Sequence, residues 1–289
     1  MPSSIRSRKS ITKLTPGEFR NYHERGYSFP HRALSLEEAE SYRKKLENYE
    51  DRNGLIMKSP YSNKPHLVFT WVHELIHNPR ILSLAESVLG PNLLVWGTNF
   101  WIKEPNDPAY VSWHQDSTYW GLSTPDVMTI WVALSTSNKE NGVMRVLANT
   151  HKRDQMVHDD TFAADNLLSR GQEVQIKVDD SEVVDMELEP GEVSLHHVKL
   201  VHGSNANSSN SRRIGLAIRM IPTHVKQTVG PKDFATLVSG EDRFNHFEYE
   251  RAPERDLGEQ EIKEHERINE INKKILYRGA NYSVGEMKK

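Results

Sequence analysis

The run WHQDSTYW at residues 113–120 places an imidazole and a carboxylate two residues apart. In an extended chain, residues i and i+2 project to the same face, so His114 and Asp116 can converge on one point while Gln115 points away. They supply two of the three ligands of the two-histidine, one-carboxylate arrangement that holds non-haem Fe(II) and leaves coordination positions open. Such pairs also arise by chance and then form surface hydrogen bonds, so the prediction depends on finding a second histidine.

Candidates for that histidine lie in the segment Leu195–Ser204. His202 ends a predicted strand, where side chains line the mouth of a barrel. His196 has the same parity and can also point inward, whereas His197 should point away. The spacing favours His202 over His196 without excluding the latter. Arg213 follows a turn rich in Ser and Asn and begins the next predicted strand, which can bring its guanidinium close to His202. The planar, charged guanidinium of an arginine beside an open metal site can bind a carboxylate through two parallel hydrogen bonds.

The composition restricts the function classes. The 289 residues include 37 Lys and Arg against 40 Asp and Glu, so we expect no positive electrostatic field that would attract a polyanion. The 14 histidines are ample for a metal site. The absence of cysteine excludes disulfides, cysteine-ligated zinc, iron–sulfur clusters and thiol nucleophiles. No apolar run approaches the ~20 residues of a membrane span, and the basic start Met1–Ser10 lacks the apolar core of a secretory signal. We therefore expect a cytoplasmic protein with no membrane partner, whose first residues form a flexible tail or a short targeting arm.

The elements that must position these residues begin with helices. Capping boxes at Thr15–Glu18 and Ser35–Glu38 predict one helix that ends at Gly26 and another that runs to about Tyr49. Asn78 and Pro79 begin a third helix that ends at Gly90, and residues 50–66 are predicted to be a loop. After Pro91 come short runs rich in β-branched and aromatic residues, which predict strands at Leu93–Lys103, Asp126–Ser135, Val143–Leu147, Val183–Leu188, Glu192–Val201 and Arg213–Ile221.

This order predicts a mainly β fold with a helical N-terminal region and a C-terminal helix, of the antiparallel barrel or jelly-roll type. The polar stretch His151–Gly171 is long enough to be a lid over the barrel mouth, and Asp256–Tyr277 predicts an amphipathic helix that ends at Gly279. We expect one domain over residues 1–289, with a flexible tail (1–14), a helical support (15–90), a jelly-roll core (91–222) and a C-terminal helical extension (223–289).

Separated motifs occur in a characteristic order. They are His114-x-Asp116, then Glu140-Asn141-Gly142-x-Met144-Arg145-Val146, then His202-Gly203-Ser204 followed by Asn207 and Ser209, and finally Arg213, eleven residues after His202. This ensemble resembles the phytanoyl-CoA dioxygenase family over roughly residues 15 to 222. The resemblance implies a double-stranded β-helix, the jelly-roll or cupin-like fold, and an oxygenase that uses Fe(II), 2-oxoglutarate and O2.

The resemblance also implies residue roles. The iron ligands would be His114, Asp116 and His202. Arg213 would bind the distal carboxylate of 2-oxoglutarate with the help of Ser204. An aromatic residue at the position of Trp120 lines the substrate pocket in the ectoine hydroxylase branch, and we expect Tyr119 and Trp131 to line it too. The chain departs from that branch at Trp101, where an amide would be expected, so ectoine is not the expected substrate.

The expected reaction is hydroxylation of an unactivated C–H bond of a small molecule. Halogenating relatives carry a small residue where this chain has Asp116, and the carboxylate disfavours a second anion. A desaturase or cyclase of the same class and a jelly-roll binding protein without turnover remain alternatives, and the histidines could be ordinary core residues. A nucleic-acid demethylase would need a basic groove, which the charge balance does not support. The sequence leaves the substrate and the oligomeric state open.

Overall fold

The structure, a computed structural model, describes residues 13–277. The predicted tail therefore lies almost entirely outside the described residues, as does Gly279. None of the helices within residues 13–277 is both long and apolar enough to cross a membrane.

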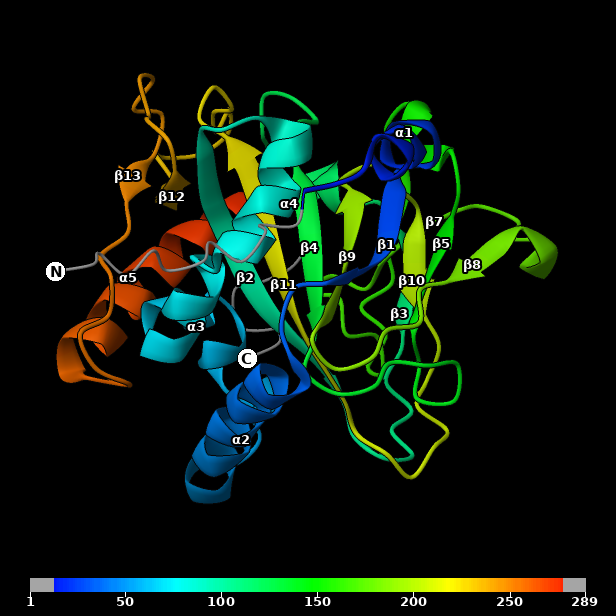
Figure 1. The fold of residues 1–289 in the computed structure, drawn as a ribbon, viewed down its shortest axis with the longest axis horizontal. Helices are drawn as coiled ribbons and strands as arrows, with labels where there is room; N and C mark the ends of the chain where they lie inside the picture. The colour runs from blue at the N-terminus through cyan, green and yellow to red at the C-terminus, as the bar shows by residue number, and fades with distance from the viewer. Residues whose placement is uncertain (1–12, 278–289) are drawn as a thin grey trace, which may run out of the picture.

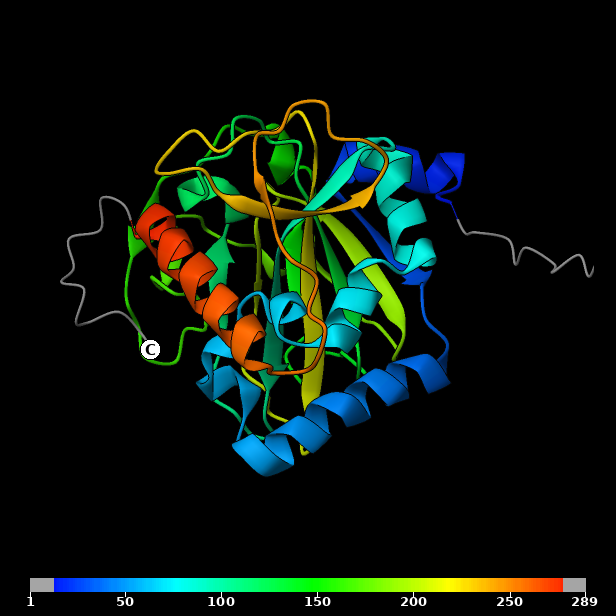
Figure 2. The same cartoon turned by 90° about the vertical axis from the view of Figure 1, so that its left-hand side faces the viewer.

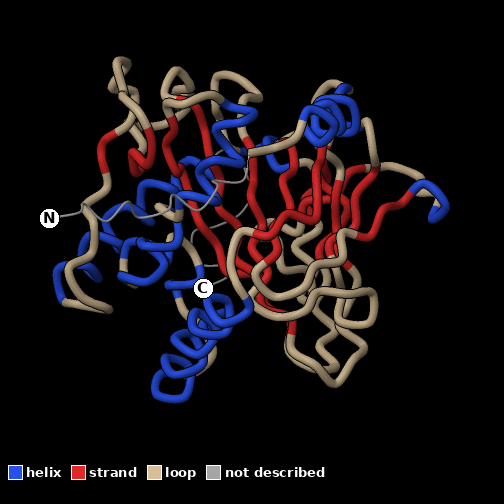
Figure 3. Tube along the Cα trace, viewed as in Figure 1, coloured by secondary structure: helices blue, strands red, loops and turns tan. Residues whose placement is uncertain are grey.

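Two antiparallel β-sheets face each other at the centre of the described chain (Figures 1 and 3). The larger sheet has the strand order β1-β9-β4-β11-β2-β12-β13, in which β12 and β13 run parallel. Its strands are β1 (Tyr27–Arg32), β2 (Leu93–Lys103), β4 (Met128–Ala133), β9 (Glu192–His197), β11 (Arg213–Pro222), β12 (Phe234–Ser239) and β13 (Glu248–Tyr249). The smaller sheet has the order β3-β10-β5-β8, with β3 (Val111–His114), β5 (Met144–Leu147), β8 (Val183–Asp185) and β10 (His202–Ser204). A short ladder joins β6 (His158–Asp160) to β7 (Gln172–Val174).

The alternation of side chains along β11 explains this layering. One face presents Ile214, Leu216, Ile218 and Met220 to a core shared with the helices, and the opposite face carries Arg213, Gly215, Ala217 and Arg219. Helices α2 (Leu36–Asn53), α3 (Thr70–Ile76) and α4 (Pro79–Leu89) contribute to that core, together with residues of β2, β4 and β9. Ala217 instead packs with apolar residues of β5, so the space between the sheets lies on the polar face of β11.

The predicted helices and strands are largely confirmed. Both capping boxes form, at the start of α1 (Pro16–Arg25) and of α2, and the C-terminal helix is α5 (Glu259–Leu276). Three differences matter. The predicted loop at residues 50–66 contains the end of α2 and three short 3-10 turns, β9 ends at His197, and His202 begins the separate strand β10 instead of ending the strand before it. The side chain of His202 nevertheless reaches the mouth, because β10 pairs with β3.

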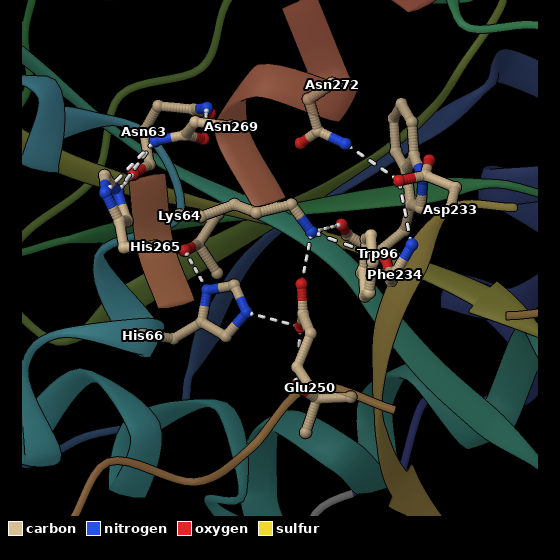
Figure 4. Close-up of polar contacts among 12 residues, drawn as sticks. Asn63, Lys64, His66, Trp96, Asp233, Phe234, Glu250, His265, Asn269 and Asn272 are labelled. Carbon is tan, nitrogen blue, oxygen red and sulfur yellow. Dashed lines mark hydrogen bonds and ion pairs between the residues drawn. The ribbon is translucent and has the colours of Figure 1, made fainter. Parts of the chain in front are cut away.

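A buried polar cluster, the Glu250 cluster, attaches the last part of the chain to the sheet (Figure 4). The carboxylate of Glu250 accepts hydrogen bonds from the ammonium of Lys64, and from Nε2 of His66 at 2.8 Å. Nδ1 of His66 lies 2.7 Å from the hydroxyl of Thr98 on β2. Burial raises the pKa of Glu250, but the charges and hydrogen bonds of Lys64 and His66 outweigh burial and lower this pKa to about 2. Helix α5 then packs across the same side of the molecule (Figure 2).

Candidate active site

Two histidines and an aspartate meet between the two sheets. His114 ends β3 and His202 begins β10, and the two residues are direct partners in the antiparallel ladder, with ring centroids 4.1 Å apart. Asp116 begins a 3-10 turn, Asp116–Tyr119, that follows β3 directly. One nitrogen or oxygen atom from each of the three side chains lies within 4.8 Å of the others. The structure thus brings together the three predicted metal ligands.

The hydrogen bonds of the two histidines orient their rings. Nδ1 of His114 lies 2.9 Å from the carbonyl oxygen of Ser112, and Nδ1 of His202 lies 2.9 Å from that of Leu200. Because a carbonyl only accepts, each Nδ1 carries a proton, and Nε2 of the neutral ring is the atom that can bind a metal. Burial lowers the pKa of His202 well below its ordinary value, which keeps the ring neutral. Two imidazoles and one carboxylate form a donor set that fits a divalent first-row metal.

The carboxylate of Asp116 is held by its surroundings. Nε2 of His114 lies 3.5 Å from Oδ1, the hydroxyl of Thr129 donates to Oδ2 at 3.5 Å, and Nε2 of His196 lies 3.9 Å from Oδ2. Burial raises the pKa of Asp116, but the close contact with His114 and the positive charge of Arg219 outweigh burial, so this pKa lies far below its usual range. Asp116 is therefore an ionised carboxylate, as a metal ligand must be.

Arg213 lies in the same cavity as the three ligands and is 2% exposed. Its Nη1 donates to the carbonyl of Gly142, while its Nε is buried without a hydrogen-bond partner. The guanidinium carbon lies 5.5 Å from the ring centroid of Trp131. Trp131 fits there because Gly215 has no side chain: a Cβ at that position would lie 1.9 Å from the indole. Arg213 is thus held in place and keeps donors for an anion.

A buried lysine lies next to Arg213. Lys103, at the end of β2, is the ladder partner of Arg213, and its Nζ donates to the hydroxyl of Ser204 at 2.7 Å. Its side chain is fully buried. Burial, followed by repulsion from Arg213, lowers the pKa of Lys103 to about 6. Lys103, Ser204 and Arg213 form a cluster of donors, the Arg213 cluster, at one part of the cavity.

The cavity has a volume of about 460 Å³, including its open mouth. Trp131 lines it, whereas Tyr119 and Trp120 are not among its lining residues. Tyr119 donates to Asp160 at 2.8 Å, and Trp120 packs against Trp96 and lines a second pocket together with Ser117 and Gln155. The reason lies in the turn at Asp116–Tyr119, because the parity of an extended strand does not continue through a 3-10 helix.

Sequence reasoning missed several polar residues of the site. Arg219 and Thr129 line the cavity, and Lys103 reaches the hydroxyl of Ser204. Arg219 could have been found from the alternation along β11, since it has the same parity as Arg213. Lys103 shows no such signal, because its role depends on the register between β2 and β11.

The predicted lid contacts the turn that carries Asp116. Gln155 and the backbone N–H of Met156 donate to the side-chain oxygen of Gln115, at 3.0 and 2.8 Å. The ring of His158 accepts from the backbone N–H of Gln115 at 2.9 Å. Residues 151–171 thus pack directly on this turn, and their function as a moving lid remains a prediction.

Comparisons with known proteins agree with this geometry. The family profile "Phytanoyl-CoA dioxygenase (PhyH)" matches residues 13–215. A protein of Stutzerimonas stutzeri named "Probable alpha-ketoglutarate-dependent hypophosphite dioxygenase" is 30% identical over 173 residues, which are 59% of this chain and 60% of that relative. The match thus spans less than two thirds of that curated relative.

Solved structures match over more of the chain. The non-heme monooxygenase ThoJ, in its apo form, superposes with a TM-score of 0.78 at 31% identity, over 89% of this chain and 96% of that one. ThoJ in complex with Ni gives a TM-score of 0.72 at 30% identity, over 88% and 96% of the two chains. CytC3 with Fe(II) and alpha-ketoglutarate shares the fold, with a TM-score of 0.61 at 23% identity over 85% and 96%.

Proposed function

The chain belongs to the phytanoyl-CoA dioxygenase family, and from this premise we propose that it is an Fe(II)- and 2-oxoglutarate-dependent oxygenase. It hydroxylates an unactivated C–H bond of a small molecule, while 2-oxoglutarate and O2 are converted to succinate and CO2. One oxygen atom of O2 enters the alcohol and the other enters succinate. The observation that carries the proposal is the convergence of His114, Asp116, His202 and Arg213 on one cavity.

The three ligands fit the metal that the family uses. The Nε2 atoms of His114 and His202 and the carboxylate of Asp116 would hold Fe(II), and the hydrogen bonds at each Nδ1 would fix the rings. Fe(II) bound there supplies the redox chemistry that activates O2 for oxidation of the keto acid and of the C–H bond. Asp116 contributes a negative charge that disfavours binding of a second anion such as chloride, which favours hydroxylation over halogenation.

The Arg213 cluster would bind the distal carboxylate of 2-oxoglutarate. Arg213 offers a planar set of N–H donors, and the hydroxyl of Ser204 is held by Lys103. Burial of these donors removes competing water, so a carboxylate gains more from them than it would at the surface. Trp131 packs beside the guanidinium and keeps the fork in one orientation.

The substrate does not follow from the relatives, whose names include hypophosphite and phytanoyl-CoA dioxygenases and an L-proline hydroxylase. The test therefore starts from small molecules that co-purify with the protein or stimulate its consumption of 2-oxoglutarate. With such a compound, turnover under ¹⁸O2 should give a product that carries one labelled oxygen atom. A product that has lost two hydrogen atoms without gaining oxygen would refute hydroxylation, and a chlorinated product would refute the role of Asp116.

A further inference from the structure

The cavity contains a second arginine that the cosubstrate does not require. Arg219 lies on β11, six residues after Arg213 and on the same face. Its ladder partners are Gly97 and Thr129, and the register of the sheet shifts directly after it. Such irregularities redirect side chains at functional sites. Arg219 lies on the side of Asp116, whose charge acts on it, whereas Lys103 and Ser204 lie beside Arg213.

The guanidinium of Arg219 has unused donors. Its Nη1 donates to Oδ1 of Asn99, its carbon lies 4.9 Å from the ring centroid of Trp120, and its Nε is buried without a partner. Within residues 13–277, no carboxylate oxygen lies within ion-pair distance of this group. Nε has no partner and Arg219 lines the cavity, and the two N–H groups on the edge that carries Nε and Nη2 match the two oxygens of a carboxylate.

Hydrogen-bonded amides fix Arg219 from one side. The side-chain nitrogen of Asn99 donates to Asn63 at 2.8 Å, and that of Asn63 donates to Asn269 of α5 at 2.8 Å. Figure 4 shows Asn63 and Asn269. Since Asn99 also accepts from Arg219, the C-terminal helix and the guanidinium belong to one hydrogen-bonded chain.

Aromatic packing fixes Arg219 from the other side. Trp120 packs against Trp96 with ring centroids 5.0 Å apart, and Nε1 of Trp96 donates to Asp233 at 2.7 Å. Asp233 in turn accepts from Asn272 of α5 at 2.8 Å (Figure 4). The guanidinium is therefore positioned before any ligand binds, which lowers the entropic cost of binding.

The cavity stays positively charged after iron and cosubstrate have bound. Its lining includes one carboxylate, Asp116, and two guanidinium groups, Arg213 and Arg219, and the dianionic keto acid carries as much charge as the divalent metal. One positive charge is left over, or two when Lys103 is protonated. Arg219 forms no ion pair within residues 13–277, and a buried charge without a partner is unfavourable.

We propose that Arg219 binds a carboxylate group of the molecule that is oxidised, so that the substrate is an organic acid. This inference rests on the proposed function and specifies its substrate class. Arg213 then selects the cosubstrate and Arg219 selects the substrate, and Asn99 and Trp120 act as positioning residues for Arg219.

The test uses the full chain loaded with Zn(II), which does not react with O2, and with 2-oxoglutarate. Calorimetry measures binding of two matched pairs of probes, acetate with acetamide and benzoate with benzamide, to the wild type, Arg219→Met and Arg219→Lys. Arg145→Met is the control, because Arg145 pairs with Asp180 and Asp185 outside the cavity. We expect Arg219→Met to weaken binding of the carboxylates at least about tenfold, and to leave the amides and 2-oxoglutarate unchanged. Arg219→Lys keeps the charge but loses the planar pair of N–H donors, so it should weaken binding of the carboxylates less than Arg219→Met does.

Other outcomes overturn the inference in distinguishable ways. If the wild type and Arg219→Met bind the carboxylates with equal affinity, or if neither protein binds them, Arg219 does not bind the substrate. Weaker 2-oxoglutarate binding in Arg219→Met would assign Arg219 to the cosubstrate, and weaker Zn(II) binding would assign it to the orientation of Asp116. If Arg219→Met does not fold, Arg219→Lys must still weaken benzoate binding and leave benzamide unchanged, or the inference fails. A wild type that binds neither Zn(II) nor 2-oxoglutarate contradicts the proposed function itself.

Discussion

Replacement of Arg213 by methionine should remove the main determinant of 2-oxoglutarate affinity. The guanidinium is buried, is packed against Trp131, and has one nitrogen engaged by the carbonyl of Gly142. Nε and the remaining N–H groups are left for the distal carboxylate. Methionine fills a similar volume, so the change removes donors and charge with little loss of packing.

The magnitude follows from the number of bonds. A hydrogen bond to a charged group contributes about 1.5–3 kcal/mol, and a bidentate contact supplies two. Loss of both would cost about 3–6 kcal/mol, or roughly two to four decades in Kd at about 1.4 kcal/mol per decade. Lys103 and Ser204 remain next to the carboxylate, so we expect the lower end, about 100-fold. Arg213→Lys should restore only part of the affinity, because lysine lacks the planar fork.

The assay is anaerobic calorimetry of the Fe(II)-loaded protein with 2-oxoglutarate and with 2-oxopentanoate, which lacks the distal carboxylate. The wild type should prefer 2-oxoglutarate strongly, and Arg213→Met should bind the two keto acids almost equally. Arg145→Met again serves as the control for loss of a nearby guanidinium. An unchanged preference for 2-oxoglutarate in Arg213→Met would refute the assignment.

Three further predictions concern the metal, the pH dependence and the stability. His202→Ala should abolish Fe(II) binding, whereas His196→Ala should retain it. The measurement is the iron content of each variant after dialysis. Loss of iron in His196→Ala and its retention in His202→Ala would make His196 the ligand in place of His202. In the free protein Lys103 loses its proton above pH about 6, and a bound carboxylate raises that pKa, so 2-oxoglutarate affinity should fall as pH rises above 6. Calorimetry in buffers of different ionisation enthalpy should detect proton uptake on binding at pH 7, and Lys103→Met should abolish it. Glu250→Gln leaves the buried Lys64 without its counter-charge and should lower the free energy of unfolding, measured by urea titration, by about 3–5 kcal/mol. The control Glu259→Gln, at an exposed ion pair, should lower it by less than about 1 kcal/mol. Because the pKa of Glu250 is depressed to about 2, its stabilisation is present above its unfolded pKa near 4.5 and should be lost as pH falls through 2.

Local signals in the sequence determined much of the fold. The capping boxes located α1 and α2, and the run of β-branched and aromatic residues located β2 at its observed bounds, Leu93–Lys103. Other elements carry no such signal. Helix α3 begins after Phe69, whose side chain makes no capping hydrogen bond, and β1 contains Pro30, which is tolerated because this strand lies at the edge of its sheet.

The site was predictable where it depends on spacing within one segment. His114 and Asp116 are two residues apart, and Arg213 follows His202 after a short loop that connects the smaller sheet to the larger one. What depends on pairing between distant segments was not predictable. The contact of Lys103 with Ser204 requires the register of β2 against β11. Trp120 stands behind Arg219 and does not itself line the cavity, because a 3-10 turn that the aromatic pattern does not reveal follows Asp116.

The most direct test of the central claim is the fate of oxygen in 2-oxoglutarate turnover. The Fe(II)-loaded protein is incubated with 2-oxoglutarate under ¹⁸O2, and succinate is analysed by mass spectrometry, with His202→Ala as the matched control. We predict succinate that carries one labelled oxygen atom, formed by the wild type and absent in the variant. Unlabelled succinate, equal yields from the two proteins, or no succinate from a fully iron-loaded wild type supplied with a panel of organic acids would contradict the proposed oxygenase function.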